Sequence, residues 1–195
     1  MTRLAALILL ASVSGCALFR GGTAPAPFLT QANQALYRLD SWRMEGRIGV
    51  QTAGDAWQAN LFWDHDTAQD RLRLSGPLSQ GMVSIVVQKD LIYINEGKGR
   101  TELSRRPDAL LRDRLGFSVP LSSLRYWILG LPDPQLGYTP LLGDGGSPAG
   151  FLQSGWTIRL DRFTTAGTRV VPQKMSVQGS GVKLKILADT WEIKG

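Results

Sequence analysis

Residues 42–63 read WRMEGRIGVQTAGDAWQANLFW, and they carry the clearest structural pattern in the sequence. Apolar side chains occupy every second position on either side of a polar centre, TAGD. These apolar positions are Trp42, Met44, Ile48 and Val50, then Trp57, Ala59, Leu61 and Trp63. A period of two is typical of a β-strand with one buried face, and the short polar centre fits a tight turn. The stretch therefore predicts two antiparallel strands.

The same pattern continues along the chain and sets the fold class. It predicts further strands at 70–75, 82–88, 91–95, 156–160, 175–177, 182–186 and 191–193. Helical spacing predicts three helices, from Thr30 to about Leu39, from Ser104 to Leu115 before Gly116, and from Leu121 to Leu129 before Gly130. We expect a mainly β protein, a curved antiparallel sheet or incomplete barrel covered by a few α-helices.

A strongly curved sheet that its helices fill only in part encloses an apolar cavity, whereas a fully filled one has a solid core. The sequence does not distinguish the two, because the same residue types line cavities and form cores. The candidate cavity residues are Trp57, Leu61, Trp63, Leu72, Leu74, Val83, Ile85, Trp127, Ile128 and Ile158. Each has the alternative of being ordinary core.

The N-terminus has the layout of an export signal. Arg3 precedes an apolar run, Leu4 to Val13, that is too short to span a bilayer, and Ser14-Gly15-Cys16 follows. Small residues before a cysteine match the bacterial lipobox, which predicts lipid on Cys16. The alternative is an ordinary signal with an incidental thiol. We therefore divide the chain into a signal at 1–15, a lipidated tether at 16–28 and a single domain at 29–195.

The net charge and the single cysteine limit which partners and binding sites the chain can have. The net charge is +6, which becomes +5 when Arg3 leaves with the signal. The basic residues are scattered, so they favour weak attraction to anionic lipid over nucleic acid. Cys16 is the only cysteine, so neither an intramolecular disulfide nor a cysteine-based metal site can form. We expect a monomer.

The sequence carries little sign of catalysis. The single histidine lies in Asp64-His65-Asp66, which we interpret as a solvated loop between strands. No second histidine exists to complete a metal site, and no Gly-x-Ser-x-Gly elbow precedes a helix. The glycines near 143–146 lack the following helix that phosphate binding requires. We therefore predict no enzyme, no metal and no cofactor.

Several segments together resemble the LolB family of outer-membrane lipoproteins. They are the lipobox, Gly46-Arg47 after Trp42, the run from Trp57 to Trp63, RLRLSGPL at 71–78, Val119-Pro120-Leu121, WILGLP at 127–132, and Leu184-Lys185-Ile186 with Trp191. One departure is Ser79, where we expect the family to have glycine. The segments span nearly the whole mature chain in order.

The resemblance implies a hydrophobic cavity for acyl chains, a location at the periplasmic face of the outer membrane, and a periplasmic carrier, LolA, that hands over triacylated lipoproteins for insertion. It also implies that Pro77 and Leu78, in the loop from Ser75 to Gly81, contact outer-membrane phospholipid. The alternative is that Leu78 folds back onto the core. Three other functions stay open from the residues: a carrier of free lipid or lipopolysaccharide, a structural lipoprotein with a solid core, and an envelope hydrolase.

Overall fold

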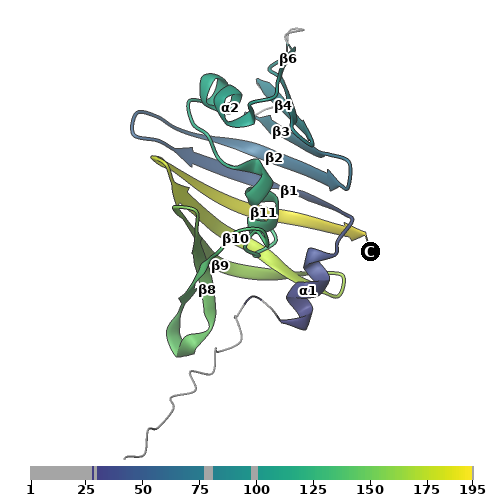
Figure 1. Cartoon of the computed structure of the whole chain (residues 1–195), viewed down its shortest axis with the longest axis vertical. Helices are drawn as coiled ribbons and strands as arrows, with labels where there is room; N and C mark the ends of the chain where they lie inside the picture. Colours follow the sequence, from purple (N-terminus) through teal and green to yellow (C-terminus); the bar gives the residue numbers. More distant parts are fainter. Residues whose placement is uncertain (1–27, 29, 77–80, 98–100, 195) are drawn as a thin grey trace, which may run out of the picture.

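The computed structural model describes residues 28, 30–76, 81–97 and 101–194 (Figure 1). Within them, eleven strands form one antiparallel sheet in the order β6-β5-β4-β3-β2-β1-β11-β10-β9-β8-β7. The strands are β1 Ser41–Gln51, β2 Ala56–Asp66, β3 Asp70–Ser75, β4 Met82–Gln88, β5 Leu91–Asn95, β6 Thr101–Ser104, β7 Thr139–Leu142, β8 Pro148–Gln153, β9 Trp156–Ala166, β10 Arg169–Gly179 and β11 Val182–Lys194.

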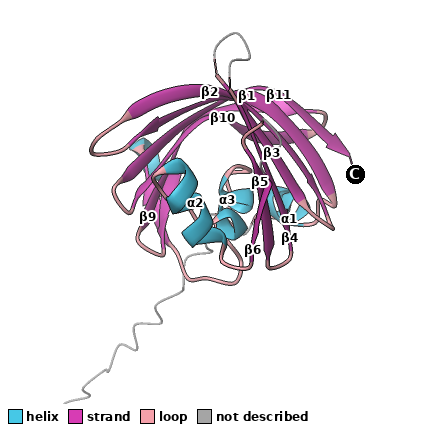
Figure 2. Cartoon of the chain, turned by 90° about the horizontal axis from the view of Figure 1, so that it is seen from above, coloured by secondary structure: helices cyan, strands magenta, loops and turns pink. Residues whose placement is uncertain are grey.

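The sheet curves into an open arch, and its helices lie on the concave side (Figure 2). They are α1 Gln31–Tyr37, α2 Pro107–Leu115 and α3 Leu121–Trp127; a 3₁₀ turn, Asp144–Gly146, joins β7 to β8. The edge strands β6 and β7 do not pair with each other, so the barrel is not closed. Among the described helices, none combines the length and apolar character needed to cross a bilayer.

The centre of the sheet follows the alternating pattern of the sequence. In β1 the even-numbered residues from Trp42 to Val50 are buried, and the strand pairs with β2 on one side and with β11 on the other. A bulge in the β1–β11 ladder falls at Glu45 and Gly46. A Cβ atom on Gly46 would lie 2.1 Å from the Leu187 carbonyl oxygen, so only glycine permits this close approach.

Most predicted elements are confirmed, with differences at the edges. Thr30 caps α1 by accepting a 3.2 Å hydrogen bond from the Asn33 backbone N–H. The short strands β6, β7 and β8 were not predicted, and Ser104 ends β6 instead of starting α2. The two strands predicted after Gly181 are one bulged strand, β11. Edge strands have one exposed face and tolerate proline and glycine, so their sequences carry no clear period.

Some predicted features lie outside the described residues. These are the signal at 1–15, Cys16 with most of the tether, and the loop residues Pro77 and Leu78. Phe28, the last residue of the predicted tether, is described and buried, with its ring 5.1 Å from that of Phe151 and 5.7 Å from that of Tyr138. The folded domain therefore includes Phe28.

Candidate functional site

The ten side chains proposed to line a cavity come together beneath the helices. Eight are buried in a single apolar cluster that runs through the whole sheet, and the other two, Trp57 and Val83, pack against it half-buried. Trp127 and Ile128 approach this cluster from the end of α3, on the concave side. The sequence pattern therefore placed all ten residues on the interior side.

The interior is closely packed in this conformation. Three of these residues are almost fully covered: the exposed fractions of Trp63, Trp127 and Ile158 are 1%, 0% and 0%. A water molecule therefore cannot contact them, either from the solvent or from within the protein. Their surfaces are covered by other protein atoms, as in an ordinary core. Whether these residues line a cavity for a ligand therefore stays a prediction, and it requires part of the cover to move.

Helix α3 is held to the sheet by a buried polar network around Gln153 of β8. The Gln153 side-chain oxygen accepts from the Trp127 indole N–H at 2.7 Å and from the Asp133 backbone N–H at 2.8 Å. Its amide nitrogen donates to the carbonyl oxygens of Asp133 and Leu136. The Ser123 hydroxyl donates to the Asp133 carboxylate at 2.8 Å. Because each group in this network has a partner, the segment after α3 is fixed in one position.

Contacts of the WILGLP segment, residues 127–132, also hold the segment after α3 in place. Gly130 has a left-handed backbone, with φ 78°, and a Cβ atom there would meet the Pro172 side chain at 3.0 Å. The Tyr37 hydroxyl of α1 donates to the Pro132 carbonyl at 2.7 Å. Partial burial, with smaller contributions from Tyr138, Asp133 and Tyr126, raises the pKa of Tyr37 well above its ordinary value near 10. Helix α1 therefore braces the same segment.

Helix α2 has weaker attachments. Two of its side chains, Leu110 and Leu111, are buried, whereas α3 buries four. An exposed ion pair joins Arg114 to Glu102 of β6 and raises the pKa of Arg114. The helix ends at Gly116 in a left-handed conformation, and the linker 116–120 leads to α3. Exposed ion pairs contribute little to stability, so α2 is the looser part of the cover.

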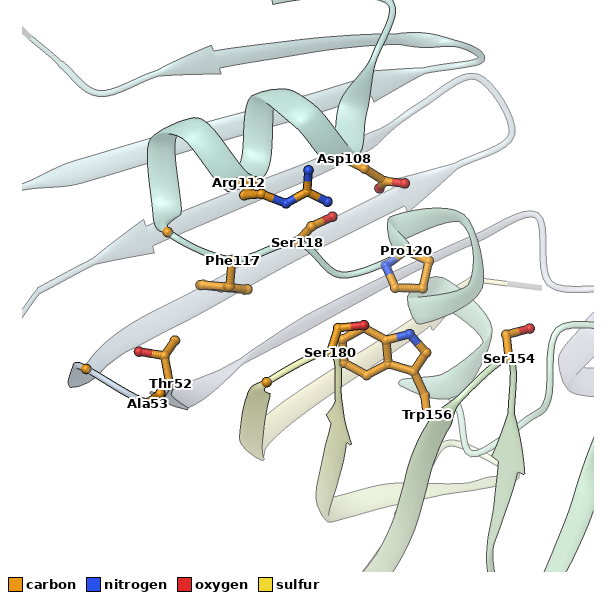
Figure 3. A pocket seen from close by; sticks show the side chains of 13 residues that line it. Thr52, Ala53, Asp108, Arg112, Phe117, Ser118, Pro120, Ser154, Trp156 and Ser180 are labelled. Atoms are coloured by element: carbon orange, nitrogen blue, oxygen red, sulfur yellow. The ribbon is translucent and has the colours of Figure 1, made fainter.

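A pocket of about 740 Å³ opens at one end of the arch, between the 116–120 linker and three strand turns (Figure 3). Phe117, Pro120 and Trp156 supply its apolar lining, and polar groups of α2 and the turns surround them. Phe117 and Trp156 are themselves buried, and their rings lie 6.3 Å from Trp57 and 5.9 Å from Trp127. Aromatic rings therefore connect this pocket with the interior.

Sequence reasoning missed Phe117 as part of the site. The residue follows the helix-ending Gly116 and precedes Val119-Pro120, so it lies in a linker where no strand or helix period applies. An apolar side chain in a short linker between two amphipathic helices was the available signal, because such a side chain is buried against whatever the helices cover.

His65 is placed differently from the prediction. It belongs to β2 instead of a solvated loop, and its ring is mostly buried, stacked on Trp42 at 5.3 Å. Its Nδ1 lies 2.8 Å from the Asp70 carboxylate, which also accepts from the Trp63 indole N–H at 2.9 Å. Asp70, the first residue of β3, is thus linked to two side chains near the end of β2. In the described part of the chain, no group of three or more His, Cys, Asp or Glu is arranged to hold a metal.

Comparison with known proteins places this architecture in a family. Residues 40–191 match the sequence profile of the family described as "Outer membrane lipoprotein LolB". The chain is 33% identical over 193 residues to the outer-membrane lipoprotein LolB of Thiobacillus denitrificans, covering 98% of each chain. It is 29% identical to that of Chromohalobacter salexigens, covering 96% of this chain and 88% of the relative.

Solved structures match at the level of fold. A DUF1329 family protein from Desulfovibrio piger superposes with a TM-score of 0.51 at 7% identity, covering 83% of this chain and 88% of that one. A LolA superfamily protein from Nitrosomonas europaea gives a TM-score of 0.48 at 8% identity, covering 81% and 88%. The near-complete sequence match carries the assignment: the chain belongs to the LolB family of outer-membrane lipoproteins.

Proposed function

We propose that the interior beneath α2 and α3 is where this protein holds the acyl chains of its cargo. As a LolB family member, it is an outer-membrane receptor that accepts lipoproteins from LolA and inserts them, and it is not an enzyme. The observation that carries the proposal is the unclosed sheet, whose apolar concave face is covered by one firmly held helix and one loosely held helix.

The energetics require such a shelter. Burying one methylene group is worth about 0.8 kcal/mol, so one long acyl chain contributes on the order of 10 kcal/mol. Its exposure to water during transfer would cost as much. When carrier, receptor and membrane offer nearly equal apolar environments, small differences in affinity are enough to direct passage without ATP.

The side chains of Trp63, Trp127 and Ile158 are covered by other protein atoms, so in this proposal α2 moves outward for acyl chains to reach them. The pocket beside Phe117 is the natural entry, because Phe117 and Trp156 lie between it and the core. The linker 116–120 can act as the hinge, since Gly116 tolerates backbone angles that other residues resist. Outward movement of α2 and Phe117 would open the interior while α3 stays in place.

Cargo release involves the β3–β4 connection in this proposal. Leu78, in the segment between Ser75 and Gly81, would enter the bilayer and promote insertion. The support is local: Met82, which pairs with Ser75 at the base of the loop, is 51% exposed. Cys16 carries the lipid that keeps the receptor at its destination, which raises the local concentration of acceptor membrane. We further propose that the protein acts as a monomer.

Transfer of a labelled lipoprotein from purified LolA to this protein tests the interior site. Leu61→Trp adds bulk among the interior side chains, and we expect it to reduce acceptance. Overpacking costs about 1–3 kcal/mol, so the chain should still fold, and a thermal unfolding transition checks this. Gln58→Trp, on the exposed face of the same strand, is the matched control. Unchanged acceptance by Leu61→Trp would exclude the space around Leu61 as the acyl site and would favour a solid core.

Leu78→Glu tests release separately from uptake. We expect this variant to accept cargo from LolA at the normal rate but to deliver less of it into liposomes, because a carboxylate is costly to bury in a bilayer. The conservative Leu78→Met variant should deliver normally. Normal delivery by Leu78→Glu at unchanged stability would remove the loop from the mechanism.

A further inference from the structure

The outward, convex face of the sheet carries a continuous row of register partners. From β4 to β10 the successive partners are Met82, Ser75, Asn60, Arg47, Leu187 and Lys174. Asn60, Arg47 and Leu187 point away from the core, because both of their neighbours along the strand are buried. Met82, Ser75 and Lys174 are their register partners and therefore lie on the same face. The base of the β3–β4 connection and the β10–β11 region therefore lie on one face, opposite to the helices (Figure 2).

A groove of about 860 Å³ crosses this face over β10, β11, β1 and β2. Its floor includes Gly49, where an added Cβ atom would meet nothing nearer than the Lys185 Cβ at 4.0 Å. Unlike Gly46, Gly49 is thus not required by close packing. The missing side chain leaves space between the basic residues at the sides of the groove, which are Arg47, Lys174, Lys183 and Lys185. We call these four residues with Gly49 the basic groove.

The lysines of the basic groove differ from three arginines of this face, which have carboxylate partners. Arg43 is paired with Asp64 and Glu192, Arg47 with Asp189, and Arg71 with Asp66. Among the described residues, no ion pair within 4.0 Å involves Lys174, Lys183 or Lys185.

Arg159 extends this charge. It lies in register with Ser176, which is itself opposite Lys185, so the two cations are two strands, or roughly 10 Å, apart. Like charges gathered at this spacing repel one another and attract an anionic partner.

We propose that the basic groove binds the phosphate groups of anionic phospholipids, so that the convex face of the sheet rests on the membrane surface. The protein is an outer-membrane lipoprotein, and its headgroup neighbours are therefore always within reach. The base of the β3–β4 connection lies on the same face. The helices then face away from the membrane, toward the periplasm. The inference rests on the location of the protein and does not require the interior to hold acyl chains.

The test uses the full lipidated chain in vesicles, with a fluorophore on a single introduced cysteine. Gln178→Cys, opposite Lys183 on the convex face, reports on the groove, and Asp113→Cys on α2 reports on the opposite side. A headgroup-attached nitroxide lipid serves as the quencher. We expect strong quenching at position 178 and weak quenching at 113 in phosphatidylcholine vesicles that contain phosphatidylglycerol. High salt or pure phosphatidylcholine should abolish the difference.

The triple variant K174Q/K183Q/K185Q isolates the groove. Each basic residue near an anionic surface favours binding roughly fivefold, so we expect the ratio of membrane-facing to free orientations to fall about 100-fold. The matched control K89Q/R105Q/R106Q removes the same charge from exposed residues outside the groove and outside the pocket beside Phe117, and it should leave quenching unchanged. Equal thermal midpoints exclude misfolding.

Three results would overturn the proposal. They are equal quenching at 178 and 113, quenching independent of phosphatidylglycerol, and unchanged quenching in the triple variant. Protection of the label at 178 by added LolA, without quenching by lipid, would instead make the groove a protein docking site. Transfer of cargo from LolA is measured on the same samples, so failure of the proposed acyl site remains distinguishable.

Discussion

Helices α2 and α3 cover the same concave face but are attached to it in different ways. Helix α3 buries Trp127 and is joined through Asp133 to the Gln153 network of β8. Helix α2 buries two leucines and is joined to β6 by one exposed ion pair. The difference assigns the two helices different tasks: α3 maintains the shape of the interior, and α2 is the part that can open. Four measurements test this difference.

The largest effect is expected for Trp127→Ala. This change removes a fully buried indole from the centre of the interior, and we expect a loss of about 4 kcal/mol in the free energy of unfolding. Urea denaturation provides the measurement. Leu110→Ala in α2 is the comparison variant, and its loss should be smaller. Equal losses would show that α2 is held as firmly as α3.

Gln153→Leu should rank next, at about 3 kcal/mol. The substitution leaves the Trp127 indole N–H and the Asp133 backbone N–H buried without acceptors and removes the side-chain donor from the Leu136 carbonyl oxygen. The Asp133 carbonyl oxygen loses one of two donors, because it also accepts from the Leu136 backbone N–H. Thermal unfolding gives the loss, with the exposed Gln58→Leu as control. A loss no greater than that of Gln58→Leu would mean that the network does not fix α3.

Tyr37→Phe tests the brace from α1. It removes the hydrogen bond to the Pro132 carbonyl, and we expect a loss of about 1 kcal/mol. The raised pKa of Tyr37 also predicts a pH effect. Above pH 10 the unfolded chain releases the phenolic proton while the folded chain retains it, so this contribution to stability declines as the pH rises. The alkaline decline should be smaller in Tyr37→Phe, and identical pH profiles would contradict the assignment.

The smallest effect on global stability is expected for Glu102→Gln, because the ion pair with Arg114 is exposed. Its effect should be local, since α2 has few other attachments. We expect an unchanged urea midpoint but faster hydrogen exchange of the amides at 110–115, with no change at 121–127. Uniformly unchanged exchange would indicate that the packing of Leu110 and Leu111, and not this ion pair, determines the opening of α2.

The sequence predicts the centre of this fold better than its edges. Strands such as β1 and β2 have one buried and one exposed face, so Trp42 to Val50 and Trp57 to Trp63 alternate clearly. The short strands β6, β7 and β8 lie at or near the edges. β6 has only four residues and none is buried, while β7 and β8 contain Pro140, Pro148 and Gly150, so no period marks them. The sequence predicts a loop at His65 because three consecutive polar residues are typical of loops. In the structure the His65 ring lies in the sheet, where it stacks on Trp42 and contacts the Asp70 carboxylate.

The sequence predicts which residues face the interior, but it does not predict whether the interior contains a cavity. Alternation identifies which side of each strand is buried, and all ten candidate residues are on that side. Whether buried side chains meet each other or leave space depends on the curvature of the sheet and on the height of the helices above it. These are properties of the assembled layers, and residues such as Leu61 or Ile158 have the same chemistry in both cases. Phe117 was missed for a related reason, because its burial depends on where the linker runs.

The pairing of β1 with β11 has a consequence for biogenesis. Trp42 lies beside Ile193, so the middle of the sheet unites the beginning and the end of the domain. During synthesis and export, β1 cannot pair with β11 until β11 has emerged from the export channel. Contacts so distant along the chain form slowly. Until then the apolar faces of β2 to β5 are uncovered, and transiently exposed apolar surface of this kind is prone to aggregation.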